Sequence, residues 1–273
     1  MSSIENKLQI SVVIIARNAE QCIGRCLESV YRWAQEIVVV TNDCIDQTAS
    51  IALSFGARVI DHPWQGFRAQ RNFARGLAST PWLLSIDADE AVSEELKCSI
   101  MDFIAKDENN YNGASCARLT YFLGKSVTHG GLYPDKSIRL FRKDKGNWEG
   151  DSSHERLRVQ GEIFPLEGNL LHYSHGSLQE QIERLLVYAE HFVNEHKGNS
   201  ISSWKICSQT FSCFFKRYIL KAGFLDGFRG FYIALLASFF RLYEYTRLYE
   251  HNLQQISSEK QSPHKISPIR GRF

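Results

Sequence analysis

Hydrophobic runs alternate with helix-periodic segments along the first ninety residues. Four apolar runs, rich in β-branched residues, have the length of strands buried on both faces: residues 10–15, 36–40, 58–60 and 82–86. The segments between them place apolar residues at helical spacing: 19–33, a stretch after Asp46, and 70–78. A strand–helix–strand repeat needs parallel crossover connections. We therefore predict an α/β fold with a mostly parallel, Rossmann-like sheet that binds ligands outside the carboxyl ends of its strands.

The pattern changes after residue 110, where short alternating segments are separated by glycine-rich turns. These segments, 116–122, 136–141, 157–159 and 170–173, predict a mixed or antiparallel extension of the same sheet. From residue 177 onward the chain is helical and amphipathic. We expect an α/β domain over 1–176 (in two halves, 1–110 and 111–176), a helical region over 177–254 and a flexible tail over 255–273.

Two segments of the helical region each carry aromatic residues on one face. In the first these residues are Trp204, Cys207, Phe211, Phe214, Tyr218 and Ala222, and in the second Phe228, Phe231, Leu235, Phe239 and Leu242. The longest uncharged run, 230–240, is about half of the ~20 residues that cross a bilayer, so we predict no transmembrane helix. Lysines and arginines around the aromatic residues favour docking on a membrane surface. The alternative is that these helices cover the sheet or form a dimer contact.

Composition narrows the class of partner and the compartment. The 273 residues include 32 Lys and Arg against 30 Asp and Glu, a net charge of +2, which argues against nucleic acid covering the whole surface. The seven cysteines form no Cys-x-x-Cys pair, and the polar N-terminus leads into a strand-length apolar run without a signal cleavage site. We therefore expect reduced thiols in a cytoplasmic protein.

Asp87-Ala88-Asp89 follows the predicted strand 82–86 directly and is the most informative short motif. Residues i and i+2 of a strand project to the same side, so both carboxylates can enter one space at the carboxyl end of the sheet. Mg²⁺ and Mn²⁺ accept carboxylate oxygens while keeping open positions for water and a substrate diphosphate. The motif therefore favours a metal-assisted site over the alternative, a solvated acidic turn.

Several ordered motifs then carry a resemblance to a known family. Segments 10–18, 36–48 and 64–90, the last including Gly66-Phe67-Arg68-Ala69-Gln70-Arg71-Asn72 before the acidic motif, resemble the nucleotide-sugar half of family 2 glycosyltransferases of the GT-A fold. Later motifs are similar to the WaaE/KdtX type of lipopolysaccharide core glycosyltransferase: 131–135, 138–142, His154-Glu155, 171–174, 223–227 and 248–250. The resemblance spans residues 10 to 250 and implies a GT-A sheet with C-terminal amphipathic helices.

The resemblance implies a donor site at the edge of the sheet. In such enzymes the first aspartate, here Asp87, lies by the ribose, and the second, Asp89, binds the Mg²⁺ or Mn²⁺ that bridges the donor diphosphate. The other residues that it places around the nucleotide sugar are Ala16, Arg17, Asn18, Arg71 and Ala88. Arg71 would meet the base or a phosphate, where a planar cation with several donors is useful, although it could also be a surface helix charge.

One departure from the family concerns the nucleotide base. The second strand usually ends in an acidic residue that contacts uracil, but this chain has Thr41 there, with Asp43 two residues later. Either Asp43 takes over this contact through a shifted turn, or base recognition is altered. Asp46 matches the family, and capping of the next helix also accounts for it.

The family inverts the anomeric configuration in one displacement, so it needs one general base and no enzyme nucleophile. Glu155 matches the family's base position best, with Asp151 as the alternative and His154 orienting the acceptor or the base. His172 is either a further metal ligand or a packed strand histidine. Asp135 and Arg139 are expected beside an acceptor groove, or else as exposed strand charges.

Together these features predict a metal-dependent transferase that moves a hexose from a nucleotide diphosphate, with glucose and UDP as first choices. The acceptor is the lipid-anchored inner core of lipopolysaccharide, met at the inner face of the cytoplasmic membrane. Within the fold, the alternatives are a transferase making a polyprenyl-phosphate sugar or another surface glycan. Outside it, the alternative is a non-catalytic, membrane-associated protein that binds a sugar nucleotide.

Overall fold

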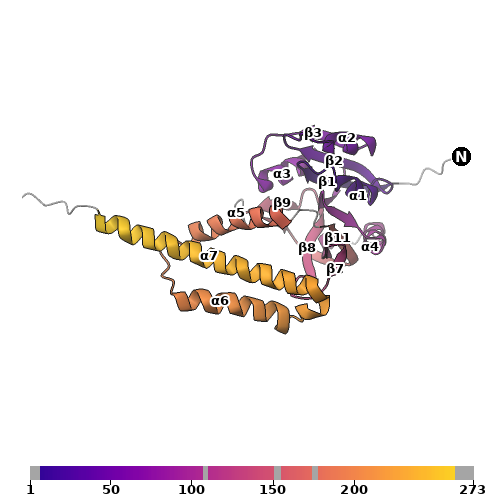
Figure 1. Cartoon of the computed structure of the whole chain (residues 1–273). Coiled ribbons are helices and arrows are strands. Elements are labelled where there is room, and N and C mark those ends of the chain that lie inside the picture. The colour runs from indigo at the N-terminus through magenta and orange to yellow at the C-terminus, as the bar shows by residue number, and fades with distance from the viewer. Residues whose placement is uncertain (1–6, 107–109, 151–154, 174–177, 262–273) are drawn as a thin grey trace, which may run out of the picture.

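A sheet-based body is followed by long helices that extend from one side of it (Figure 1). The computed structural model describes residues 7–106, 110–150, 155–173 and 178–261. The main sheet has nine strands in the order β3-β2-β1-β4-β8-β6-β11-β5, with β7 paired to β6, and β9 pairs with β10 separately. The strands are β1 Leu8–Ala16, β2 Ala34–Thr41, β3 Arg58–Asp61, β4 Trp82–Asp87, β5 Glu90–Val92, β6 Tyr111–Phe122, β7 Lys125–Val127, β8 Asp135–Arg142, β9 Gly146–Glu149, β10 Arg156–Val159 and β11 Glu162–Tyr173.

Strand directions divide the sheet as the hydrophobic pattern predicts. The four strands from β3 to β4 are parallel, and Val13 of β1 pairs with Val38 of β2 and Ser85 of β4. Strand β8 is antiparallel to both β4 and β6, whereas β11 runs parallel to β6. The predicted α/β class with a mixed extension is therefore confirmed. One detail is wrong, because residues 157–159 (β10) pair with β9 and do not extend the main sheet.

Both faces of the parallel strands are covered, which explains their continuous apolar sequences. Val12 and Ile14 of β1 belong to the larger core, with Ile23 of α1 and Ile100 of α4, and Val13 packs in a second core behind α3. The segment 19–33 is α-helical only over α1, and single-turn hydrogen bonds flank that helix. The helices of this body are α1 Ile23–Glu28, α2 Thr48–Ser54, α3 Phe67–Leu77 and α4 Glu94–Ala105.

The C-terminal region is a helical layer in which α7 runs between α5 and α6 (Figure 1). Its elements are α5 Leu178–His196, α6 Ser203–Phe215, the π-helical turn η1 Lys216–Leu220, the 3₁₀ turn η2 Gly223–Asp226 and α7 Gly227–Gln261. The chain reverses between α6 and α7 at a tight crossing, where a side chain on Gly230 would collide with the backbone of Gly223. Helix α7 continues through Gln261, so the expected tail does not begin at residue 255.

The predicted aromatic faces are largely uncovered. Trp204 of α6 is 81% exposed and Phe228 of α7 is 69% exposed, and Phe211, Leu235, Phe239 and Leu242 are exposed as well. The stretch Gly223–Gln255 is long and apolar enough to cross a membrane by length and composition alone, and 22% of its most apolar window is buried. The sequence-based exclusion of such a helix is thus too strict, because an 18-residue window can hold two charges and stay apolar on average.

Specific contacts hold the helical region against the sheet body. Arg229 at the start of α7 donates hydrogen bonds to the carbonyl oxygens of Phe122 and Leu123, at 3.1 and 2.9 Å. The ring of Phe122 stacks on Tyr232, with ring centroids 5.3 Å apart. The amide of Gly130, in the loop after β7, donates to the carbonyl of Lys221 at 2.9 Å. The β6–β7 hairpin and the loop that follows it therefore fix the position of the helices.

Candidate active site

A cavity of about 830 Å³ lies at the carboxyl ends of β1 and β4, where the parallel topology places a ligand. Its walls include most residues of the predicted donor site: Ala16, Arg17, Asn18, Arg71, Asp87, Ala88 and Asp89. Glu155, just before β10, and His172 of β11 line the same cavity. The fold thus brings the acidic motif and the expected base into one space, although they lie almost seventy residues apart in the chain.

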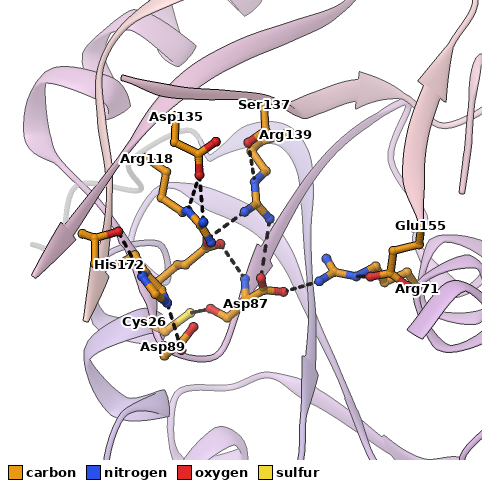
Figure 2. Close-up of polar contacts among 12 residues, drawn as sticks. Cys26, Arg71, Asp87, Asp89, Arg118, Asp135, Ser137, Arg139, Glu155 and His172 are labelled. Atoms are coloured by element: carbon orange, nitrogen blue, oxygen red, sulfur yellow. Dashed lines mark hydrogen bonds and ion pairs between the residues drawn. The ribbon is translucent and has the colours of Figure 1, made fainter. Parts of the chain in front are cut away.

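Asp87 is the last residue of β4 and lies between two guanidinium groups (Figure 2). Its Oδ1 atom is 2.7 Å from Nη2 of Arg71, and its Oδ2 atom is 3.8 Å from Nη1 of Arg139. Burial by itself raises the pKa of this carboxyl, but Arg71 and Arg139 outweigh it and hold the pKa below its usual range. Asp87 is therefore a fixed anion at neutral pH, and its neighbours hold it in one orientation.

Behind Asp87 lies a chain of charges that the sequence analysis did not identify. Glu90 is fully buried, accepts a hydrogen bond from the amide of Asp87 at 2.9 Å, and pairs with Arg139 at 2.7 Å. Burial and the charge of Asp87 raise the pKa of Glu90 despite Arg139. Arg118, on β6 next to β8, pairs with Asp135 at 2.7 Å (Figure 2), and its Nη1 atom lies 3.9 Å from Oε1 of Glu90.

This chain of charges corrects the expected position of Arg139. Arg139 was expected beside an acceptor groove, but its side chain is buried against Glu90 and does not line the cavity, because β8 lies in the middle of the sheet. Asp135 is exposed at the start of β8 and pairs with Arg118, which fits the alternative of an exposed strand charge, and it lies outside the cavity walls. Arg118 does line the cavity, and a lone arginine in a strand gives no sequence signal for that position.

Glu155 faces Arg71 across the cavity. Its Oε1 atom is 3.2 Å from Nε of Arg71, and the same guanidinium lies 4.6 Å from the ring centroid of Trp148. The other oxygen, Oε2, is buried without a hydrogen-bond partner among the described residues. Burial and the charge of Asp87 raise the pKa of Glu155, while Arg71 opposes the shift. An acid with one unsatisfied oxygen and a raised pKa is well suited to accept a proton from a bound hydroxyl.

Asp89 and His172 form the second acid–base pair of the cavity (Figure 2). Nε2 of His172 is 3.3 Å from Oδ2 of Asp89, and Nδ1 is 3.4 Å from the hydroxyl of Thr120. Two cis ligands at about 2.1 Å from an octahedral ion stand roughly 3.0 Å apart, so the pair fits one divalent cation. Within the described part of the chain, no group of three His, Cys, Asp or Glu residues is placed to hold a metal, which leaves the other positions to water or substrate.

The turn after β2 is tied to the turn after β1. Asn18 adopts a left-handed conformation (φ 47°), and its Oδ1 atom accepts a hydrogen bond from the amide of Ile45 at 3.0 Å. Thr41 is buried and donates to Asp61 at 2.8 Å, so it does not replace the family's base-contacting acid. Asp43 is exposed and does not line the cavity, whereas Ile45 of the same turn does, so a contact of Asp43 with the base stays a prediction.

Two further groups of residues complete the comparison with the predicted site. Asp151 and His154, the alternative base and the expected acceptor contact, lie outside the described residues. Tyr188 of α5 and Cys22 line the cavity, and neither belongs to a motif that sequence reasoning could use. Burial, together with Asp89, raises the pKa of the Cys22 thiol to about 11, so it is no thiolate ligand at neutral pH.

Comparison with known proteins shows the family of the chain. Residues 11–160, more than half of the chain, match glycosyl transferase family 2. An uncharacterized glycosyltransferase of Rickettsia typhi is 28% identical over 90% of this chain and 88% of its own length. The lipopolysaccharide core biosynthesis glycosyltransferase LpsC of Rhizobium meliloti is 32% identical over 64% of this chain and 67% of its own. Residues 1–349 of S. aureus TarS superpose with a TM-score of 0.45 at 16% identity, covering 91% of this chain and 92% of that one.

Proposed function

This chain belongs to glycosyl transferase family 2, and from that premise we propose that it transfers a hexose from a UDP sugar to the inner core of lipopolysaccharide. Glucose is our first choice of hexose. The observation that carries the proposal is the cavity at the carboxyl ends of β1 and β4, which Asp87, Asp89 and Glu155 share. The similarity to LpsC supports the choice of acceptor.

The donor is proposed to lie along the ends of β1 and β4. Ala16, Arg17 and Asn18 form the floor beneath the nucleoside, and Asp87 meets the ribose hydroxyls as an oriented anion. Arg71 already bridges Asp87 and Glu155, so its guanidinium is positioned to exchange part of this pairing for a donor phosphate. This would free the Glu155 carboxylate at the moment the donor is bound.

Asp89 and His172 are proposed to hold a divalent cation, Mg²⁺ or Mn²⁺, as two cis ligands with open positions. Such an ion, when bound, neutralises negative charge on the departing nucleoside diphosphate. The protein's own contribution is to fix the two ligands on different elements, the turn after β4 and strand β11. The hydroxyl of Thr120 contacts the other ring nitrogen of His172, which orients the ring.

The reaction is proposed to be a single displacement with inversion. The acceptor hydroxyl oxygen forms a bond to the anomeric carbon as the bond from that carbon to the diphosphate oxygen breaks. The hydroxyl proton passes to Glu155, which lines the same cavity as Asp87 and Asp89 and whose Oε2 atom has no hydrogen-bond partner among the described residues. Asp151 is retained as the alternative base.

The enzyme is proposed to work at the inner face of the cytoplasmic membrane, where a lipid-anchored acceptor is found. The exposed aromatic faces of α6 and α7, flanked by lysines and arginines, have the composition of interfacial helices. A polyprenyl phosphate or another surface glycan as acceptor would use the same donor site. Acceptor assays with each class separate these possibilities.

Asp89→Asn tests the donor and metal site. We expect transfer of glucose from UDP-glucose to core oligosaccharide to fall by roughly 10³-fold, because the variant loses a charged ligand while keeping the side-chain volume. Binding of UDP-glucose, measured by calorimetry with and without Mn²⁺, should lose its dependence on the metal. Asp144→Asn, an exposed aspartate in the turn before β9, is the matched control and should retain wild-type values.

Two results would contradict the proposal. Full transfer activity in Asp89→Asn would remove the metal assignment. Donor binding without any turnover in the wild-type protein, across all acceptor classes, would favour the non-catalytic alternative.

A further inference from the structure

A second cavity, of about 870 Å³, lies between the helical region and the sheet body. Helix α6 contributes Gln209, Ser212, Cys213 and Lys216, and helix α7 contributes Ile233, Leu236, Ala237, Phe240, Arg241 and Tyr245. The remaining walls are Leu185 of α5, Arg217 and Lys221 at the helix reversal, and Gly130, Gly131 and Leu132 in the loop after β7. None of these residues belongs to the candidate active site described above, so the cavity needs its own explanation.

One end of the cavity is cationic. Lys216, Arg217 and Lys221, at the reversal between α6 and α7, line that end, and Arg241 lines the cavity further along α7. No Asp or Glu is among the lining residues in the described part of the chain. Arg241 pairs with Glu244 at 2.9 Å, and Nη1 of Arg217 donates to the carbonyl oxygen of Gly130 at 3.4 Å. Lys216, Arg217 and Lys221 form no ion pair with any carboxylate that the structure describes. Three cations that have no counterion among the described residues and lie around one cavity favour an anionic ligand.

The other walls are apolar. Leu132 of the loop after β7, Leu185 of α5, and Ile233, Leu236 and Phe240 of α7 face the same space. At the reversal, Ile219 and Leu220 are exposed between Lys216 and Lys221, so the cationic end borders apolar surface on the outside as well. A ligand that satisfies both kinds of wall carries a negatively charged head and a hydrocarbon tail.

We infer that this cavity binds the phosphate head of an anionic lipid, with the three cations around the phosphate and part of the acyl chain on the apolar walls. Lysine and arginine are the usual partners of lipid phosphates at a membrane surface. Leu185 and Tyr188 lie one turn apart on α5, and they line the second cavity and the candidate active site respectively. An occupied lipid site would therefore stabilise the helix that forms one wall of the active site. The ligand class does not depend on which sugar the enzyme transfers.

Calorimetry on the full chain with short-chain lipids below their micelle concentration tests the inference. Dihexanoyl phosphatidic acid should bind saturably with one molecule per chain. Dihexanoyl phosphatidylcholine, whose head carries no net charge, and inorganic phosphate, which has no tail, should each bind at least tenfold more weakly. Equal affinity for inorganic phosphate would overturn the lipid assignment and leave a simple anion site, and absence of binding by phosphatidic acid would overturn the inference entirely.

Two variants localise the binding. K216Q/K221Q removes two cations from the cavity and should weaken phosphatidic acid binding at least tenfold, while K125Q/K205Q, which removes two exposed lysines elsewhere, should not. Ala237→Trp fills the apolar part and should weaken phosphatidic acid binding tenfold while leaving phosphate binding unchanged. Equal losses in both lysine pairs would show non-specific attraction, and an unaffected Ala237→Trp would exclude the apolar walls. UDP-glucose binding should be unchanged in all three variants, so a failure here is distinct from a failure of the donor site.

Discussion

In most proteins charged side chains are exposed and apolar side chains are buried. The sheet body and the helical region depart from this rule in opposite ways. The sheet buries charge: Glu90 and Arg139 lie buried beneath the cavity, next to Asp87 in the cavity wall, and the side chain of Glu90 is 0% exposed. The helical region exposes apolar surface, with Trp204 and Phe228 among its most exposed side chains. Both arrangements cost free energy in isolation.

The free-energy cost of buried charge and that of exposed apolar surface are offset in different ways. Inside the sheet, each charge has a partner of opposite sign within the protein, so the buried ions form a fixed electrostatic frame beneath the cavity. On α6 and α7, the exposed apolar side chains are not covered by other described residues. We expect another molecule to cover them. The charges of the sheet are paired within the protein, whereas the helical region leaves apolar side chains exposed, as the proposed docking on a membrane requires.

Glu155→Gln gives the largest expected effect and tests whether the charges of the sheet body do chemistry. The amide cannot accept a proton, so transfer should fall by roughly 10²- to 10⁴-fold, while UDP-glucose affinity is retained. Because burial raises the pKa of Glu155, the wild-type rate should fall on acidification around a pKa above the usual glutamate value of about 4.3, where the base becomes protonated. Initial rates between pH 4 and 8 measure this fall of the rate at acidic pH, the acid limb of the pH profile.

The control for this change is Glu149→Gln, at an exposed glutamate of β9, which should leave both rate and pH profile unaltered. If Asp151→Asn abolishes transfer while Glu155→Gln keeps the acid limb, the base is Asp151. In that case the Glu155–Arg71 pair would have a structural role, and the charges of the sheet body would still be paired within the protein.

The sequence predicts the sheet and the donor side of the cavity because both depend on local patterns. The β-branched run at 10–15 predicts a strand buried on both faces, and the acidic motif at 87–89 predicts a ligand site at the end of a strand. The chain of charges behind Asp87 could not be predicted, because Arg118 and Arg139 come from strands that meet β4 only through the order of the sheet. The position of Arg139 was predicted wrongly for the same reason. An arginine in a strand is expected to be exposed unless its neighbours in the sheet are known.

Arg139→Met tests whether the buried charges hold one another in place. Removing the guanidinium leaves Glu90 buried without its 2.7 Å partner, so the free energy of unfolding should fall by about 3–5 kcal/mol, measured by urea denaturation. The double variant Arg139→Met/Glu90→Gln removes both charges and should recover part of that loss. An unchanged free energy of unfolding in the single variant would mean that the Arg139–Glu90 pair adds nothing to stability. The buried charges would then not hold one another in place.

Leu235→Ser, the smallest expected effect, tests whether the exposed face of α7 is covered by lipid. Leu235 is 49% exposed, and transferring a leucine from water to an apolar environment contributes about 1.5 kcal/mol or more, so partitioning onto vesicles with anionic lipids should weaken roughly tenfold. Leu53→Ser makes the same change at a 60% exposed position on α2 of the sheet body and should leave partitioning unaltered. Sedimentation with vesicles measures both. Equal behaviour of the two variants would place the membrane contact elsewhere, and a change from dimer to monomer in Leu235→Ser would identify a second copy of the chain as the cover.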